Sequence, residues 1–185
     1  MPLHIFEPRY RQMVARCLEY DRRFGLIYHD PDRMGPFAME ERRVGTVARI
    51  GEFQVLPDGR SLLVAHGESR FRIVDGIESR TPYFEGLVES FEDEPGVDPE
   101  ELIYRRRRSL NLLMALAVRL REEDEEGVDP LPPLDPAQEV SFRVARAIQL
   151  DPLWLQQLLE LPDERVRLRR LDQVLSQALE ELQEG

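Results

Sequence analysis

Apolar residues near the start of the chain repeat at the spacing of an α-helix. Pro8 follows Glu7, and proline suits the first turn of a helix because its φ angle is already close to the helical value. The next apolar positions recur every three or four residues and form one stripe, made of Tyr10, Met13, Val14, Cys17 and Leu18. The pattern therefore predicts one early helix whose apolar stripe packs inward.

After this helix the apolar residues gather in short segments that predict β-strands. The segments span residues 24–28, 44–56, 62–65, 71–77 and 83–91. Asp75-Gly76 interrupts the fourth segment, and Pro57-Asp58-Gly59-Arg60 forms a turn in which proline fixes the first corner and glycine tolerates positive φ. Residues 29–41 are rich in turn formers and predict a loop. Several short strands at close intervals favour a small barrel or a sandwich.

Composition changes after residue 92, where an acidic linker precedes a helical region. Asp98-Pro99 is a typical helix start, with an acidic N-cap and proline at the first helical position. The pattern predicts further helices over residues 136–148, 152–160 and 163–183. Residues 122–136 are acidic and proline-rich, and they predict a mobile loop.

Together these patterns predict an α+β protein with two parts. Residues 1–92 form a β-rich subdomain with one early helix, and residues 98–185 form an α-helical bundle. The 185 residues are enough for a real core.

The composition predicts a cellular location and argues against nucleic acid as a partner. No apolar segment approaches the ~20 residues of a membrane helix, and the start of the chain lacks the zones of a signal peptide. Because the single cysteine, Cys17, cannot form an internal disulfide, the expected location is the cytoplasm. The formal charge of -11 repels a phosphate backbone on average, so nucleic acid is a disfavoured partner.

The side chains needed for several kinds of catalysis are missing. All 25 basic residues are arginine, which excludes a Schiff base, a Ser–Lys dyad and a P-loop lysine. His4, His29 and His66 lack the spacing of metal ligands. Cys17 lies on the apolar stripe with no base to activate it. The sequence therefore predicts no catalytic residue, no cofactor and no metal.

Several segments, in order, resemble the N-terminal substrate-recognition domain of Lon proteases. They are His4-Ile5-Phe6-Glu7-Pro8-Arg9-Tyr10-Arg11, Asp21–Gly25, Val44–Ala48, Leu56–Arg60 with Gly67–Ile73, and Ile148–Pro152 with the leucine-rich run to Asp163. The resemblance implies a PUA-like β pseudobarrel followed by a helical bundle. It also implies a stand-alone member of the family, since the ATPase module and the Ser–Lys peptidase domain of the full proteases are absent from this sequence.

The resemblance implies a non-catalytic module that binds exposed apolar or unfolded polypeptide, as an adaptor or a holdase in protein quality control. Arg9 and Tyr10 at the start of the first helix, with Phe37 and Met39 in the following loop, are the candidate polypeptide-binding residues. Each has a structural alternative: Tyr10 packs inward, and Phe37 and Met39 cover the core. Family members usually begin with one more strand, so its absence predicts an open sheet edge that supports a homodimer.

An RNA-binding PUA-like domain is the alternative function. Arg70 and Arg72 flank Phe71, and Arg105–Arg108 is the most basic run in the chain. Arg70, Arg72, Arg105 and Arg108 are the candidate phosphate contacts. The competing interpretation of the four consecutive arginines is a solvated helix with ion pairs, because they point in all directions around a helix.

Overall fold

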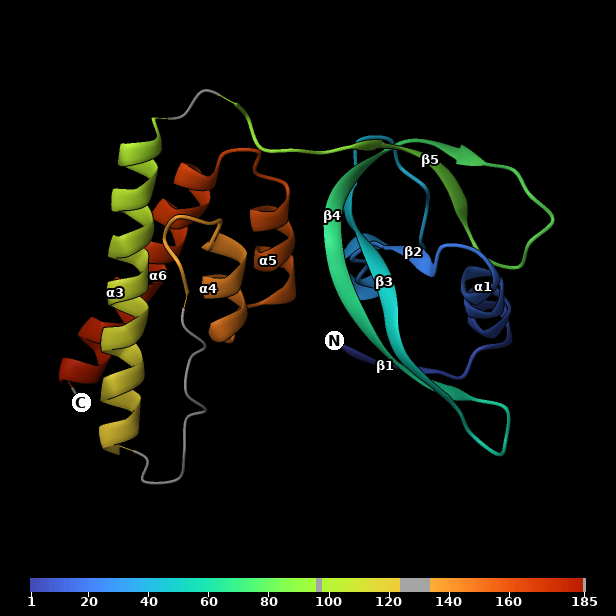
Figure 1. The fold of residues 1–185 in the computed structure, drawn as a ribbon, viewed down its shortest axis with the longest axis horizontal. Coiled ribbons are helices and arrows are strands. Elements are labelled where there is room, and N and C mark those ends of the chain that lie inside the picture. Colours follow the sequence, from blue (N-terminus) through green and yellow to red (C-terminus); the bar gives the residue numbers. More distant parts are fainter. Residues whose placement is uncertain (96–97, 124–133, 185) are drawn as a thin grey trace. The chain divides into compact units, whose positions relative to one another are not determined.

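The computed structural model describes residues 1–95, 98–123 and 134–184 of the chain (Figure 1). The chain divides into two compact units, Met1–Glu92 (unit 1) and Asp93–Gly185 (unit 2). Unit 1 contains all the strands, and unit 2 is helical. The chain is therefore an α+β protein. Within the described residues, none of the helices is both long enough and apolar enough to cross a membrane.

Unit 1 is built on one curled antiparallel sheet. Its strands are β1 (Pro2–Ile5), β2 (Arg23–Leu26), β3 (Val44–Val55), β4 (Ser61–Ile77) and β5 (Glu85–Ser90). Their order is β1-β4-β3-β2, and β5 pairs with the second half of β4. The long strands β3 and β4 curve together, and α1 (Pro8–Glu19) lies inside the curve (Figure 1).

The early helix begins and packs as the apolar stripe predicts. Val14 is buried, and the rest of the stripe packs beside it against Ala48, Ile50, Leu63 and Ala65 of the sheet. Glu7 occupies the N-cap position, but its side chain does not hydrogen-bond to the first backbone amides of the helix. Its carboxylate instead accepts a hydrogen bond from Arg9 at 2.8 Å. The apolar face of α1 therefore closes the core of unit 1.

Four details of unit 1 differ from the prediction. A strand that the sequence pattern did not predict, β1, precedes α1. The two strands predicted on either side of residue 66 form a single strand, β4, which continues through Asp75-Gly76. A register irregularity between Ile73 and Asp75 absorbs one extra residue there, which is how a β-bulge keeps a strand paired. The predicted loop contains a short helix, α2 (Pro31–Met34), capped by the carboxylate of Asp30. The last strand begins at Glu85 rather than at residue 83.

Unit 2 consists of α3 (Pro99–Glu123), α4 (Ser141–Ala147), α5 (Pro152–Leu159) and α6 (Glu164–Glu184). Side-chain oxygens of Asp98, Asp151 and Asp163 accept hydrogen bonds from the first backbone amides of three of these helices at 2.8–3.0 Å. The helices enclose a core that contains Leu113, Val144, Leu158, Leu171 and Leu175.

The predicted loop over residues 122–136 lies mainly outside the described residues. Its first two positions belong to α3, which is helical through Glu123. The helix predicted from residue 136 begins at Ser141, because the chain turns at Asp135, whose side chain accepts a hydrogen bond from the amide of Ala137 at 2.8 Å.

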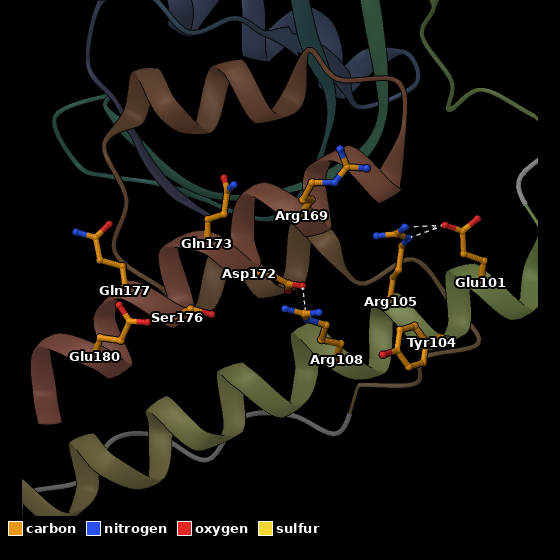
Figure 2. Close-up of a pocket in the computed structure, with 10 residues that line it drawn as sticks. All are labelled: Glu101, Tyr104, Arg105, Arg108, Arg169, Asp172, Gln173, Ser176, Gln177 and Glu180. Atoms are coloured by element: carbon orange, nitrogen blue, oxygen red, sulfur yellow. Dashed lines mark hydrogen bonds and ion pairs between the residues drawn. The ribbon is translucent and has the colours of Figure 1, made fainter.

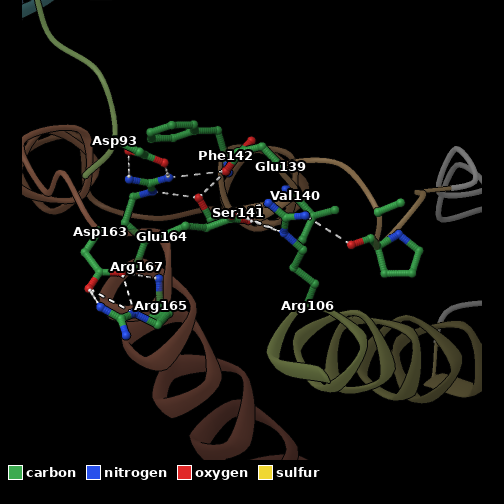
Figure 3. Close-up of polar contacts among 12 residues, drawn as sticks. Asp93, Arg106, Glu139, Val140, Ser141, Phe142, Asp163, Glu164, Arg165 and Arg167 are labelled. Carbon is green, nitrogen blue, oxygen red and sulfur yellow. Dashed lines mark hydrogen bonds and ion pairs between the residues drawn. The ribbon is translucent and has the colours of Figure 1, made fainter. Parts of the chain in front are cut away.

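Arg167 is the centre of a polar network in unit 2 (Figure 3). Its side chain is 0% exposed and donates to both carboxylate oxygens of Asp93, at 2.7 and 2.6 Å. It also donates to the hydroxyl of Ser141 and the carbonyl of Leu161, each at 2.8 Å, and it lies 4.5 Å from the ring of Phe142. These contacts join α6 to the segment around Asp93, to α4 and to the turn before α6.

Arg106 contradicts the prediction that the four arginines form a solvated face. It is buried and binds both carboxylate oxygens of Glu164, at 2.5–3.1 Å, while the amide of Val140 donates to the same carboxylate (Figure 3). Arg105 does pair with Glu101 as the i,i+4 spacing predicts, at 2.7 Å.

Candidate functional site

The edge strand β5 exposes large apolar side chains. β5 pairs with β4 along one edge, and no other described strand pairs with it. Leu87 and Val88 are 56% and 45% exposed, and Phe84, directly before the strand, is 55% exposed. We call these three residues the β5 surface. Proteins usually protect exposed edge strands with charges or proline, because the unpaired backbone groups are a template for pairing with another chain.

The β5 surface has apolar side chains on both faces of the strand. Because alternate residues of a strand point to opposite faces, Phe84 and Val88 share one face and Leu87 occupies the other. A segment extended along the free edge would therefore find apolar contacts above and below its backbone. The free edge and the exposed side chains on both faces are the geometry that strand addition by an extended segment requires.

Met39 packs onto the paired glycines of β4 and β5. Gly76 and Gly86 are opposite each other in the sheet, and Met39 lies over both. A β-carbon on Gly76 would be 3.2 Å from the Met39 β-carbon, and one on Gly86 would overlap the end of its side chain. Met39 therefore covers the sheet, as its structural alternative predicted.

Phe37 connects the loop before β3 to the β5 surface. Its ring is 4.5 Å from the ring of Phe84 and 5.2 Å from that of His29, and the guanidinium of Arg43 lies 5.4 Å from it. Nδ1 of His29 is buried and has no hydrogen-bond partner. Phe37 thus supports the inner side of Phe84, whose outer part stays exposed.

Arg9 and Tyr10 lie at the other end of α1 from the β5 surface. Tyr10 packs against the core of unit 1, and the Arg9 guanidinium lies 4.6 Å from its ring. Arg16, about 10 Å further along the helix, donates to the Tyr83 hydroxyl at 3.2 Å and to Glu85 at 2.7 Å. The hydrogen bond to Tyr83 raises the pKa of Arg16 above its usual value. Arg16 therefore joins α1 to the start of β5.

The candidate phosphate contacts belong to separate units and have partners. Arg70 and Arg72 lie over the ring of Phe91 at 4.7 and 4.4 Å, in unit 1. Arg105 pairs with Glu101, and Arg108 pairs with Asp172 at 3.2 Å, in unit 2. The described residues include no group of three histidine, cysteine, aspartate or glutamate side chains that could hold a metal ion.

Cys17 is half-buried on α1, and its environment makes the thiol a weak nucleophile. Burial raises the pKa of the Cys17 thiol, and the nearby Asp21 carboxylate adds to the shift. Since only the thiolate reacts with alkylating reagents, a raised pKa leaves little reactive form near neutral pH.

We expect iodoacetamide to modify Cys17 in the folded protein at pH 7.5 at least about tenfold more slowly than in the denatured protein. Mass spectrometry after timed quenching measures both rates, and free cysteine in the same two buffers corrects for the denaturant. Equal corrected rates in the two states would contradict the burial of this thiol.

The chain matches the family model described as the ATP-dependent protease La (LON) substrate-binding domain over residues 1–177. The chain belongs to this family. The match spans both units, so the Lon substrate-binding domain here includes the sheet and most of the helices. In the coarse terms of the family, it is a substrate-recognition module and not a catalytic domain.

Relatives of the Lon family support the assignment along the chain. Lon protease 2 from Herpetosiphon aurantiacus is 31% identical over 174 residues, which is 94% of this chain and 20% of that protein. The chain therefore spans about a fifth of the length of this curated relative.

Two solved Lon N-terminal domains share the fold. The N-terminal domain of Mycobacterium avium complex Lon protease has a TM-score of 0.65 at 22% identity, over 95% of this chain and 90% of that one. A Lon N-terminal domain protein from Xanthomonas campestris has a TM-score of 0.60 at 25% identity, over 92% and 86%.

Proposed function

We propose that this Lon substrate-binding domain is a non-catalytic module that binds exposed apolar or unfolded polypeptide segments. The observation that carries the proposal is the β5 surface, three exposed apolar side chains at an edge strand that has one unpaired edge among the described residues and also carries Glu85 and Glu89. Isolated exposed apolar residues are ordinary on proteins, but an apolar edge strand is a recognised template for β-strand addition.

Strand addition explains how one surface could accept many sequences. The backbone of an added segment would pair with β5, and that pairing does not depend on side-chain identity. Phe84, Leu87 and Val88 would bury apolar side chains of the segment, which folded proteins keep inside. Since the contacts are mainly backbone pairing and apolar burial, we expect the affinity to vary little with salt.

Finer statements belong to the same proposal. We infer a PUA-like pseudobarrel for unit 1, from its curled sheet, and a helical bundle for unit 2, from its packed helices. A cytoplasmic adaptor or holdase is the role that fits a recognition module without catalytic groups. A homodimer is a second consequence of the free edge of β5, because a second copy is itself a source of strands.

We expect Leu87→Lys to weaken the binding of an unfolded polypeptide about tenfold, because a charged side chain on an edge strand opposes strand addition. Fluorescence anisotropy of a labelled, permanently unfolded polypeptide measures the affinity at low and at high salt. Tyr20→Lys is the matched control, since Tyr20 is 76% exposed beyond the end of α1. It should bind within about twofold of the original chain.

Two results would overturn this proposal. Equal binding by the Leu87→Lys variant and the original chain would remove the β5 surface as the site. Absence of binding to the unfolded polypeptide, together with salt-sensitive binding of a short RNA, would remove the function and favour the RNA-binding alternative.

A further inference from the structure

A second concave surface lies in unit 2, between α3 and α6 (Figure 2). The groove has a volume of about 920 Å3, and every residue that lines it comes from one of these two helices. α3 contributes Glu101, Tyr104, Arg105 and Arg108, and α6 contributes Arg169, Asp172, Gln173, Ser176, Gln177 and Glu180. The lining is polar, unlike the β5 surface.

Several side chains of this lining already form ion pairs within unit 2. Arg105 is neutralised by Glu101, and Arg108 is neutralised by Asp172, which also accepts a hydrogen bond from the buried hydroxyl of Ser109. The contacts of Arg108 and Ser109 with Asp172 join α3 to α6, whereas the Glu101–Arg105 pair lies within α3. They do not leave a charge free for a ligand.

Four other side chains of the lining are not paired in this way. The side chains of Tyr104, Arg169, Gln173 and Ser176 make no hydrogen bond or ion pair with any described residue, whereas the Gln177 amide donates to the Glu181 carboxylate at 3.0 Å. Tyr104 is 67% exposed. Tyrosine and arginine are the residues most often found at the energetic centres of protein interfaces, and a glutamine amide both donates and accepts.

The spacing along α6 matches that of an extended chain. Arg169, Gln173 and Gln177 are four residues apart, so they follow one another at about 6 Å along the helix (Figure 2). Alternate residues of an extended strand repeat at about 6.6 Å. Glutamine amides at these positions can therefore meet successive backbone groups of one extended segment, whatever its side chains are.

Opposite charges lie at the two ends of the groove. Arg169 is its uncommitted cation, and Glu180 lies eleven positions later on the same helix, about 16 Å away. An acidic side chain is favoured beside Arg169 and disfavoured beside Glu180. The groove therefore complements a segment that is acidic at one end only.

We propose that the groove between α3 and α6 binds an extended polypeptide segment with an acidic residue at the Arg169 end. This inference deepens the proposed function and rests on it, since it adds a polar site to the apolar one on β5. Gln173 and Gln177 hydrogen-bond to the backbone of the segment, Tyr104 packs against it, and Arg169 selects the acidic residue.

The test uses two labelled unfolded polypeptides, identical except that glutamates in one replace glutamines in the other. We expect the intact chain to bind the acidic probe about tenfold more tightly in anisotropy at low salt. Arg169→Ala should abolish this preference, so that the two probes bind with the same affinity. Gln173→Ala should weaken both probes about threefold.

Matched controls separate the groove from general surface effects. Arg170→Ala removes the neighbouring arginine of α6, which does not line the groove, and Gln157→Ala removes an exposed glutamine of α5. Both should leave the two affinities and the preference unchanged. Loss of the preference in Arg170→Ala as well would show that total charge, and not the groove, selects the acidic probe.

The outcomes also separate this inference from the proposed function. If the intact chain binds both probes and Leu87→Lys weakens them, while Arg169→Ala and Gln173→Ala have no effect, the groove inference alone is wrong. If the intact chain binds neither probe, the groove inference and the proposed function are both wrong. If the groove variants act and Leu87→Lys does not, the polypeptide site lies in unit 2.

Discussion

Replacing Arg167 with methionine is expected to lower the free energy of unfolding of unit 2 by about 3 kcal/mol, more than a hundredfold in the folding equilibrium. The guanidinium is 0% exposed, and its hydrogen bonds hold Asp93, Ser141 and Leu161. Methionine fills a similar volume but donates nothing, so the buried Ser141 hydroxyl and the Leu161 carbonyl lose a donor, and the partly exposed Asp93 carboxylate loses its ion-pair partner.

The single tryptophan makes this prediction simple to measure. Trp154, the only tryptophan in the chain, packs against the core of unit 2, so its fluorescence during denaturation reports that unit. Arg169→Met is the matched control on the same helix, because Arg169 is exposed; it should change the stability by less than about 0.5 kcal/mol. Equal shifts of the two variants would show that the Arg167 network contributes nothing specific.

Gly45→Ala is expected to destabilise unit 1 by about 2–3 kcal/mol, the upper part of the usual range of about 1–3 kcal/mol for overpacking in a core. A β-carbon at Gly45 would lie 2.6 Å from the backbone carbonyl oxygen of Leu26 and would overlap the ring of Phe71. The carbonyl belongs to the neighbouring strand β2, so the clash cannot be relieved by turning a side chain.

Cys17 can report this effect, because its thiol becomes reactive when unit 1 unfolds. We expect Gly45→Ala to lower the denaturant concentration at which pulsed alkylation modifies Cys17. Gly67→Ala is the control, since a β-carbon there would meet only the Thr46 methyl group, at 3.2 Å. A Gly45→Ala midpoint equal to that of the original chain would mean that the β2–β3 pair separates at little cost.

Local features of the sequence predict most of the elements because their causes are local. Pro8 begins α1, and the carboxylates of Asp98, Asp151 and Asp163 cap three later helices. The break predicted at Asp75-Gly76 is wrong for a non-local reason. Gly76 pairs with Gly86 and is covered by Met39, and neither partner is close in sequence.

The buried arginines show a second limit of sequence reasoning. Arg106 pairs with Glu164, which lies 58 residues later in the sequence. Arg167 pairs with Asp93, which lies 74 residues earlier. Helical periodicity assigns each of them to a face, but it cannot reveal a carboxylate on another segment. For Arg106 the charge predicted exposure, whereas the buried carboxylate of Glu164 takes the place of water.

The candidate site could be predicted only in part. Phe37 and Met39 were singled out, and both contact the elements around β5, but their side chains mainly pack against the protein. Leu87 and Val88 were assigned to a strand without any sign that they would be exposed. Alternation along a strand gives two faces, and which edge stays free depends on how all five strands pair.

The pairing of β1 with β4 sets the order in which a ribosome can complete unit 1. Pro2–Ile5 is made before the other strands of unit 1, and its partners, Ser61–Val64, are made about 60 residues later. At 5–20 residues per second, β1 waits roughly 3–12 seconds for its neighbour. During that interval Leu3 and Ile5 are exposed on an unpaired strand. If the proposed function is correct, a domain that binds unfolded chains itself contains, during this interval, an unpaired apolar segment of the kind it binds.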